Sequence, residues 1–271
     1  LGHEGVLVLL SDSTTAEEPG FAGSERDLRA TFDAIVRQSK GRIIFSTFSS
    51  NIHRIQQIID AVTPEGRRVF VDGRSIVSSM KVAHKVKLLT MPDGVFVQQD
   101  EMGGIPKDKL LIVTTGTQGE PMSGLSRLAR GEHECVKIGR GDTVVLSADP
   151  IPGNEEMVAR TVDNLFRRGA NVFYRSEDKV HVSGHGASGD LKLMLSLTRP
   201  RFFVPIHGEY RHLVWHKRLA ESIGVASNHV FVLENGQSLT VDRDHLAPVK
   251  RISAEGVLID GLALGLADSP I

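Results

Sequence analysis

Segments typical of strands alternate with segments typical of helices along most of the 271-residue sequence, and this alternation is what most constrains the fold. Apolar runs rich in β-branched residues at 6–11, 42–48 and 110–115 predict buried strands. Residues 51–62 and 154–168 have the apolar spacing of amphipathic helices. Repeated strand–helix units place their strands parallel, so we expect an α/β fold with a mainly parallel sheet flanked by helices.

The rest of the sequence extends the same pattern. Further strands are expected at 67–71, 143–147, 171–174 and 201–206, and further helices at 24–39, 75–86, 121–129, 191–197 and 209–223. Ser24 and Asp27 form a capping box at the start of one helix. Asn235-Gly236 between two apolar runs predicts a β-hairpin, and the irregular residues 91–106 predict a surface loop.

Composition excludes several classes of protein. The formal net charge is -1, so no global positive field attracts nucleic acid, and any RNA-binding surface must be built locally. The single cysteine, Cys135, excludes a disulfide scaffold and a cysteine-rich zinc site, and suits a reducing cytoplasm. No apolar run approaches the ~18 residues of a membrane span, so we expect no membrane partner.

The two ends of the sequence suggest a segment of a longer protein. The sequence begins with Leu1 and has no signal-peptide pattern before its first apolar run. Residues 263–271 are typical of the start of a linker. We therefore expect further residues on both sides of this chain.

Three short polar loops share one expected layout, in which an apolar strand leads through small polar residues into a helix. They are residues 48–52, 115–121 and 182–186. Free amides and the dipole at a helix N-terminus favour an anion such as phosphate, particularly at the carboxyl ends of parallel strands. For any one loop, ordinary helix capping is the simpler interpretation, and the three loops together favour the two interpretations about equally. None of the loops matches a P-loop or a GxGxxG motif, so a nucleotide cofactor is not indicated.

Two histidines and an aspartate are expected at one edge of a sheet. His185 and His207 are separated by about eleven helical residues, roughly 16 Å, and six strand residues, roughly 20 Å. Because these two rises nearly cancel, both histidines return to the edge where Asp12 ends the first strand. The group could support a metal or acid–base site. On spacing alone, a capping aspartate with two hydrogen-bonded histidines is the simpler interpretation.

Six ordered motifs resemble those of a known family, and the resemblance extends from Val6 to about Gly265. The motifs are SDST (11–14), TFSSNIHR (47–54), TGTQGEP (115–121), PIPGNE (150–155), HVSGHG (181–186) and PIHGEYR (205–211). Together they resemble the bacterial ribonuclease J family, in the β-CASP branch of the metallo-β-lactamase superfamily. One departure is small, since Thr117 stands where many members carry serine.

The resemblance implies a division into domains. Residues 1–25 would belong to an αββα metallo-β-lactamase domain, residues 26–183 to a β-CASP domain, and residues 184–262 to the returning part of the first domain. Residues 263–271 would begin a linker. The family's HxHxDH signature, its next histidine ligand, its bridging aspartate and its C-terminal domain are expected outside this chain.

The resemblance also implies roles for individual residues. Asp12 would be the motif A acid that orients His185, the motif B histidine that transfers a proton to the leaving oxygen. His207, the motif C histidine, would ligate one of two divalent metals, usually zinc, with manganese or magnesium as alternatives. The residues implied to bind RNA and its phosphate are Ser50, Asn51, Ile52, His181, Val182, Ser183, Gly184 and His185.

The activity implied by the resemblance is metal-dependent phosphodiester hydrolysis. The family acts on single-stranded RNA as a 5′–3′ exonuclease and an endonuclease, favours a 5′-monophosphate, and works in cytoplasmic rRNA processing and mRNA decay. Homodimers or tetramers and an RNA-decay complex are the expected partners.

Three alternatives remain open. The first is a non-catalytic RNA-binding fragment, with a channel lined by Arg127, Arg130, Lys137 and Arg140, although a solvated charged face explains these residues as simply. The second is an mRNA 3′-end endonuclease of the β-CASP group, which the TGTQGEP and PIPGNE motifs disfavour. The third, a doubly wound cofactor enzyme, has the least support.

Overall fold

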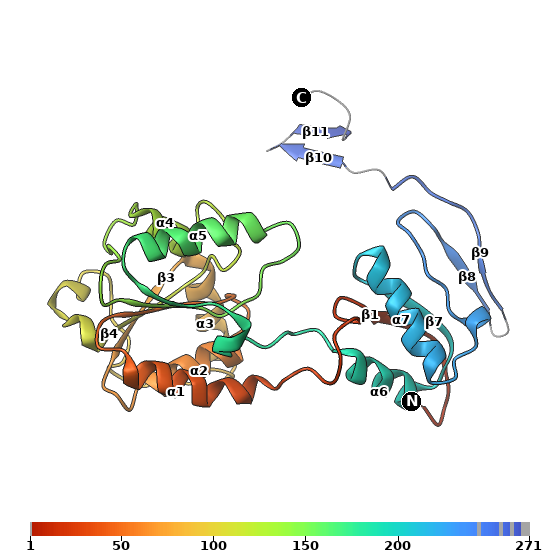
Figure 1. The fold of residues 1–271 in the computed structure, drawn as a ribbon, viewed down its shortest axis with the longest axis horizontal. Helices are drawn as coiled ribbons and strands as arrows, with labels where there is room; N and C mark the ends of the chain where they lie inside the picture. The colour runs from red at the N-terminus through yellow and green to blue at the C-terminus, as the bar shows by residue number, and fades with distance from the viewer. Residues whose placement is uncertain (1, 243–244, 255–256, 261–262, 267–271) are drawn as a thin grey trace. The chain divides into compact units, whose positions relative to one another are not determined.

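The computed structural model describes residues 2–242, 245–254, 257–260 and 263–266. The chain divides into two compact units (Figure 1). Unit 1 comprises Leu1–Ala22 and Gly184–Ile271, and unit 2 comprises Gly23–Ser183. The domain boundaries expected after residues 25, 183 and 262 stay predictions.

Helices and strands alternate as the sequence predicts. The helices are α1 (Leu28–Gln38), α2 (Ile52–Val62), α3 (Arg74–Lys85), α4 (Gly124–Arg130) and α5 (Glu155–Arg167) in unit 2, and α6 (Ser188–Thr198) and α7 (Tyr210–Ser222) in unit 1. The strands are β2 (Ile43–Ser46), β3 (Arg68–Asp72), β4 (Leu110–Thr114), β5 (Thr143–Leu146) and β6 (Asn171–Phe173) in unit 2, and β1 (Val6–Asp12), β7 (Pro200–Ile206), β8 (Leu239–Val241), β9 (Leu246–Pro248), β10 (Val257–Asp260) and β11 (Ala263–Leu266) in unit 1. Short 3-10 helices are η1 (Glu25–Asp27), η2 (Met102–Gly104), η3 (Lys107–Lys109), η4 (Ser176–Asp178) and η5 (Ser227–His229).

Unit 2 is a doubly wound α/β unit. Its five strands are all parallel, in the order β3-β4-β2-β5-β6. Figure 1 shows α1, α2 and α3 on one face of this sheet and α4 and α5 on the other. Successive side chains of β2 point to opposite faces of the sheet, so Ile43 and Phe45 pack with α1–α3 and Ile44 packs with α4 and α5. The expected parallel sheet flanked by helices is therefore confirmed.

The helices that follow β2 and β5 cover opposite faces of the sheet, although these two strands are neighbours. Their connecting loops therefore diverge at the carboxyl ends of the strands. In open α/β sheets, ligands bind in the crevice that such a divergence creates. The segments after Ser46 and Leu146 are thus the part of unit 2 where a ligand is most expected.

Unit 1 is built around the parallel pair β1 and β7, which places Asp12 opposite Ile206. Phe203 on β7 is fully buried with Leu195 of α6 and Ala220 of α7. Strands β8 and β9 pair antiparallel, as do β10 and β11. Strand β11 occupies the start of the linker expected from residue 263, and residues 267–271 of that expected linker lie outside the described residues.

Several local predictions are confirmed and two are wrong. The capping box forms, because the Asp27 carboxylate accepts from the Ser24 backbone N–H at 2.9 Å. The predicted hairpin around Asn235-Gly236 does not form. Val230 forms a bridge with Phe203 instead, and strand β8 pairs with β9. The residues expected to form the first strand of the hairpin pair with β7 instead, since the Phe231 N–H donates to the Phe203 carbonyl at 2.9 Å.

The third predicted strand–loop–helix layout is also wrong. No strand directly precedes residues 182–186; the 3-10 helix η4 and an irregular stretch lie between β6 and this segment. The predicted surface loop at 91–106 is only partly correct. Phe96 within it forms a bridge with Val69, and Val97 and Met102 are buried.

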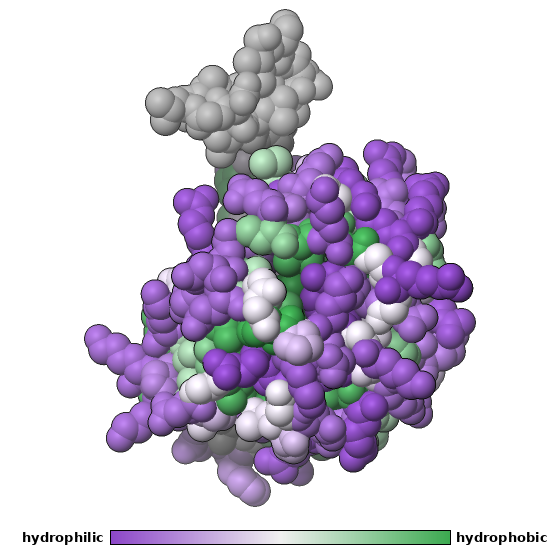
Figure 2. Space-filling view, turned by 90° about the vertical axis from the view of Figure 1, so that its left-hand side faces the viewer, coloured by the Kyte–Doolittle hydropathy of each residue, from purple (hydrophilic) through white to green (hydrophobic). Residues whose placement is uncertain are grey.

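One face of the molecule is largely polar. On the face shown in Figure 2, hydrophilic side chains predominate and hydrophobic ones form a narrow strip. In the part of the chain that the structure describes, no helix is both long and apolar enough to span a membrane.

Candidate functional site

The carboxyl ends of β1 and β7 bring Asp12 and His207 together. The two strands are parallel and in register, so Asp12 ends one strand beside Ile206, and His207 follows directly. His207 adopts φ +54°, a left-handed conformation that is uncommon for a residue other than glycine. Such conformations persist where the surrounding structure enforces them, often at functional sites.

Asp12 holds the rings of both histidines. Its Oδ2 lies 2.5 Å from His185 Nδ1, and its Oδ1 lies 3.0 Å from His207 Nδ1. The two rings lie 5.5 Å apart between centroids. The predicted meeting of Asp12, His185 and His207 at one edge is therefore confirmed, although their chemical roles are not tested by this geometry.

Thr14 completes the support of the Asp12 carboxylate. Its backbone N–H donates to Asp12 Oδ1 at 2.9 Å and its hydroxyl donates to the same oxygen at 2.7 Å. Partial burial opposes ionisation of Asp12. The hydrogen bonds from the Thr14 backbone, His185, the Thr14 hydroxyl and His207 outweigh it and hold the pKa of Asp12 well below its usual value.

The ionised carboxylate fixes the tautomer of each histidine. A carboxylate can only accept hydrogen bonds, so Nδ1 of both His185 and His207 carries a proton when it faces Asp12. Nε2 is then the nitrogen that points away from the acid. This is the arrangement in which a carboxylate orients a metal-binding histidine, or supports one that transfers a proton.

The donor set fits part of a metal site. Asp12, His185 and His207 each offer a ligand atom, and these atoms lie within 4.8 Å of one another. Among the described residues this is the one group of three or more such side chains close enough to hold an ion. Zinc takes about four ligands in a structural site and three from protein in a catalytic site. His207, oriented through Nδ1, fits one ligand position, and the described residues offer less than the set that two metals need.

A buried histidine lies behind this group. Ser13 Oγ lies 3.0 Å from His216 Nδ1, and the His216 ring packs edge-on against Phe203 at 4.7 Å between centroids. Burial lowers the pKa of His216 to about 4, although the charge of Asp12 acts in the opposite direction. His216 is therefore neutral at pH 7 and helps to fix the segment that carries Asp12.

The other predicted RNA-binding residues lie mostly in unit 2. Ser50, Asn51, Ile52, His181, Val182 and Ser183 belong to unit 2, whereas Gly184 and His185 belong to unit 1. Asn51 is the N-cap of α2, and its Oδ1 accepts from the Arg54 N–H at 3.1 Å. The capping alternative thus holds for Asn51, and its amide Nδ2 in addition donates to Glu25 Oε1 at 3.1 Å.

The loop at 115–121 is occupied by internal contacts. The buried Gln118 donates from Nε2 to the Asp149 carbonyl at 2.9 Å and accepts from the Ile151 N–H at 2.7 Å. Ser123, beyond the loop, caps α4. This loop therefore fixes the segment after β5. Of the cations in the RNA-channel alternative, Arg130 pairs with Glu132, Arg127 is half-buried, and Lys137 and Arg140 are exposed.

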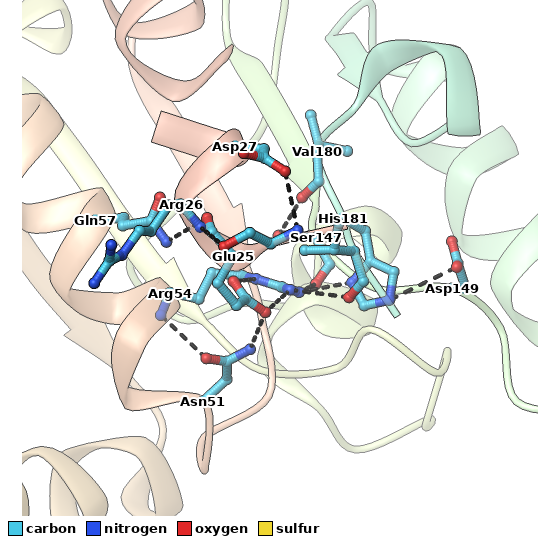
Figure 3. Close-up of polar contacts among 12 residues, drawn as sticks. Glu25, Arg26, Asp27, Asn51, Arg54, Gln57, Ser147, Asp149, Val180 and His181 are labelled. Carbon is cyan, nitrogen blue, oxygen red and sulfur yellow. Dashed lines mark hydrogen bonds and ion pairs between the residues drawn. The ribbon is translucent and has the colours of Figure 1, made fainter. Parts of the chain in front are cut away.

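Sequence reasoning missed the most buried cation of unit 2. Arg54 is 0% exposed and contacts Glu25, Ser147 and His181 (Figure 3). It also contacts the Val182 carbonyl. A signal was present in the sequence, because Arg54 stands four residues before Ile58 and seven before Ala61, on the buried face of α2. A charged residue on an apolar helix face needs buried partners.

Two family models match the chain. Residues 40–165 match the β-CASP domain of ribonuclease J, and residues 171–233 match the RNA specificity domain of Zn-dependent metallo-hydrolases.

Several curated proteins are similar over almost the whole chain. Ribonuclease J of Thermus thermophilus is 41% identical over 264 residues, which are 97% of this chain and 46% of that protein. Ribonuclease J of Synechocystis sp. is 40% identical over 96% of this chain and 40% of its own length. Ribonuclease J2 of Bacillus subtilis is 38% identical over 98% of this chain and 48% of its own length.

The fold and these matches define the chain as part of a metallo-hydrolase of the β-CASP group. The chain belongs to the ribonuclease J family. It spans less than half the length of each of these three relatives.

Proposed function

We propose that this chain is part of a metal-dependent ribonuclease that hydrolyses phosphodiester bonds in single-stranded RNA, as a 5′–3′ exonuclease and as an endonuclease. The observation that carries the proposal is that the Asp12 carboxylate contacts both His185 and His207, in each case at ring nitrogen Nδ1. The match of the chain to an RNA specificity domain supports RNA as the substrate.

His207 and His185 have separate proposed roles. His207, held through Nδ1, would ligate one of two divalent metals through Nε2, with zinc as the first choice and manganese or magnesium as alternatives. Such metals, when bound, polarise the scissile phosphate and supply a hydroxide nucleophile. His185 would carry a proton at Nε2 and deliver it to the leaving oxygen, while the Asp12 carboxylate stabilises the imidazolium.

The RNA would bind through the segments that the family resemblance indicates. Ser50, Asn51 and Ile52 lie at the N-terminus of α2, where free amides and the helix dipole favour a phosphate. The segment from His181 to Ser183 follows Val180, whose carbonyl accepts from Ser147 at the end of β5. A terminal monophosphate would be preferred, because its extra charge strengthens each hydrogen bond in such a site.

We assign this activity to RNA processing and decay in the cytoplasm, within a homodimer or tetramer and an RNA-decay complex. The support is membership of the ribonuclease J family.

The proposal is tested with the purified protein, manganese or zinc, and a 5′-monophosphorylated single-stranded RNA labelled at that phosphate. We expect release of labelled mononucleotide, and loss of this release in His207→Ala and in the presence of a chelator. Binding of the RNA without any cleavage in either metal would contradict catalysis and favour an RNA-binding role.

A further inference from the structure

Arg54 is a fully buried cation whose hydrogen bonds are complete. Its guanidinium has five N–H donors. Nε donates to Glu25 Oε2 at 3.2 Å, and Nη2 donates to Glu25 Oε1 and to the Val182 carbonyl at 3.3 Å. Nη1 donates to the Ser147 carbonyl at 2.7 Å and to His181 Nδ1 at 2.7 Å. A lysine at this position offers three donors and no planar fork, so it cannot reproduce the set.

These partners come from separate segments of unit 2. Glu25 lies in η1, Ser147 directly follows β5, and His181 lies in the segment after η4 (Figure 3). Val182 follows His181 in the same segment. Glu25 also accepts from Asn51 Nδ2, and Ser147 Oγ donates to the Val180 carbonyl at 2.5 Å. Arg54 therefore joins the loop before α2 to the His181 segment, across the crevice between β2 and β5.

The contact with Arg54 fixes the tautomer of His181. A guanidinium only donates, so His181 Nδ1 must accept and carry no proton. The ring is then neutral and its proton is on Nε2. Burial and the charge of Arg54 lower the pKa of His181. The charges of Asp149 and Glu25 and a hydrogen bond with the Ser147 backbone oppose them only in part.

The protonated nitrogen of His181 already faces an anion. Nε2 lies 3.6 Å from Asp149 Oδ2, and the Asp149 side chain is 67% exposed. The position beside this nitrogen is therefore held by an anion that is itself in contact with solvent. A phosphate oxygen has the same acceptor chemistry as the carboxylate.

We propose that Arg54 is a positioning residue for RNA binding, which holds the loop before α2 and the His181 segment at a fixed separation and presents the Nε2–H of His181 to an RNA phosphate. The inference rests on the proposed function, in which these two segments bind RNA. Arg54 itself is buried and does not touch the RNA.

A second buried ion pair provides the matched control. Arg42 Nη2 donates to Asp142 Oδ2 at 2.7 Å, and both side chains are at least nine-tenths buried. Arg42 precedes β2 and Asp142 precedes β5, so this pair joins the same two strands at their amino ends. Arg42→Lys therefore disturbs a buried pair of the same type without touching the RNA-binding segments.

The first test reads the tautomer of His181 in the whole protein labelled with 15N-histidine, using two-bond 1H–15N spectra. The His181 signals are identified by their loss in His181→Gln. We expect the Nε2–H form at pH 7 in the wild type and in Arg42→Lys, and a mixture of tautomers in Arg54→Lys. A protonated Nδ1 in the wild type would overturn the inference without affecting the proposed function.

The second test measures affinity for a 5′-phosphorylated 2′-O-methyl oligoribonucleotide by fluorescence anisotropy. We expect Arg54→Lys to weaken binding at least five-fold and Arg42→Lys to change it less than two-fold, at temperatures well below the unfolding midpoint of each variant. Equal losses in the two variants would overturn the positioning role.

Two further outcomes are distinguishable. If Arg54→Lys does not fold, Glu25→Gln replaces it, because the amide keeps one acceptor and places N–H groups against the guanidinium. We expect Glu25→Gln to weaken RNA binding at least three-fold. An unchanged affinity would overturn the inference. If the wild type shows the expected tautomer but binds no RNA, the proposed function fails, and the RNA role of Arg54 fails with it.

Discussion

The two clusters of this chain fix their histidines in opposite ways. In unit 1 an anion, Asp12, accepts from Nδ1 of His185 and of His207, so Nδ1 carries the proton and Nε2 is the ring nitrogen that points away from Asp12. In unit 2 a cation, Arg54, donates to Nδ1 of His181, so that Nε2 carries the proton. The charge of one neighbour thus decides which ring nitrogen of a neutral histidine carries the proton.

The clusters also differ in their exposure to solvent. The His207 side chain is 67% exposed and that of Asp12 is 38% exposed, whereas the Arg54 side chain is 1% exposed. An exposed group is accessible to a metal and substrate, and a buried, fully bonded group holds its neighbours in place. We therefore interpret unit 1 as contributing reacting groups and the Arg54 cluster as contributing geometry.

The largest expected effect comes from removing the charge of Asp12 in unit 1. Asp12→Asn places an amide where both histidines need an acceptor, so their tautomers are no longer both fixed. We expect kcat/KM on single-stranded RNA to fall by about 10²–10⁴-fold. Glu17→Gln, a neutralised carboxylate in the following loop, is the control and should retain activity within about two-fold. Similar activities for Asp12→Asn and the control would show that Asp12 does not orient a reacting group.

Removing a donor near the N-terminus of α2 tests the binding side of the comparison. Ser50→Ala should lower kcat/KM on 5′-monophosphorylated RNA by an amount that corresponds to about 1.5–3 kcal/mol of transition-state stabilisation, the range for a hydrogen bond to a charged group. Internal cleavage should change much less, because it does not need the terminal phosphate. The measurement is kcat/KM on matched 5′-monophosphate and internally cleaved substrates, and equal losses in both assays would remove Ser50 from the phosphate site.

Acid should destabilise the wild type through His216. Its pKa of about 4 in the folded protein lies below the ordinary value near 6.5, so the unfolded state binds more protons as pH falls. This contribution to stability is present above pH 6.5 and is lost between about pH 6.5 and 4. From pH 7 to pH 5 it amounts to about 2 kcal/mol.

The pH effect is isolated by comparing denaturant unfolding of the wild type and His216→Asn at both pH values. Asparagine keeps a hydrogen-bonding amide for Ser13 but does not titrate. We expect the wild type to lose about 2 kcal/mol more than the variant. An equal loss in both proteins would mean that His216 is not neutral in the folded state.

The smallest expected effect concerns the anion beside His181. Asp149→Asn removes a negative charge 3.6 Å from Nε2 while keeping a side chain of similar size. RNA affinity should rise by about two- to five-fold, because the charge is exposed and largely screened by solvent and salt. A fall in affinity at low salt would show that Asp149 helps to hold the RNA and does not compete with it for His181.

The sequence predicted much of the fold and of the unit 1 cluster for physical reasons. The rises of α6 and β7 are fixed by backbone geometry, so the return of His207 to the edge of His185 and Asp12 followed from residue counts alone. The parallel sheet followed from the alternation of strands and helices. Both inferences depend on regular backbone structure.

Other features depended on contacts between residues distant in sequence. The Asn235-Gly236 turn favoured a hairpin, but Val230 pairs with Phe203, 27 residues earlier in the sequence, and this contact has no local signature. The role of Arg54 depends on Glu25 and His181, which no spacing rule connects to α2. Tertiary contacts override local preference in both cases.

The most direct test of the central claim is a two-bond 1H–15N spectrum of the histidine rings at pH 8, where an ordinary histidine is neutral. Signals are assigned by single substitutions at residues 181, 185 and 207. We predict that His185 and His207 carry their proton on Nδ1 and that His181 carries it on Nε2. The same tautomer at all three positions would contradict the opposite roles assigned to Asp12 and Arg54.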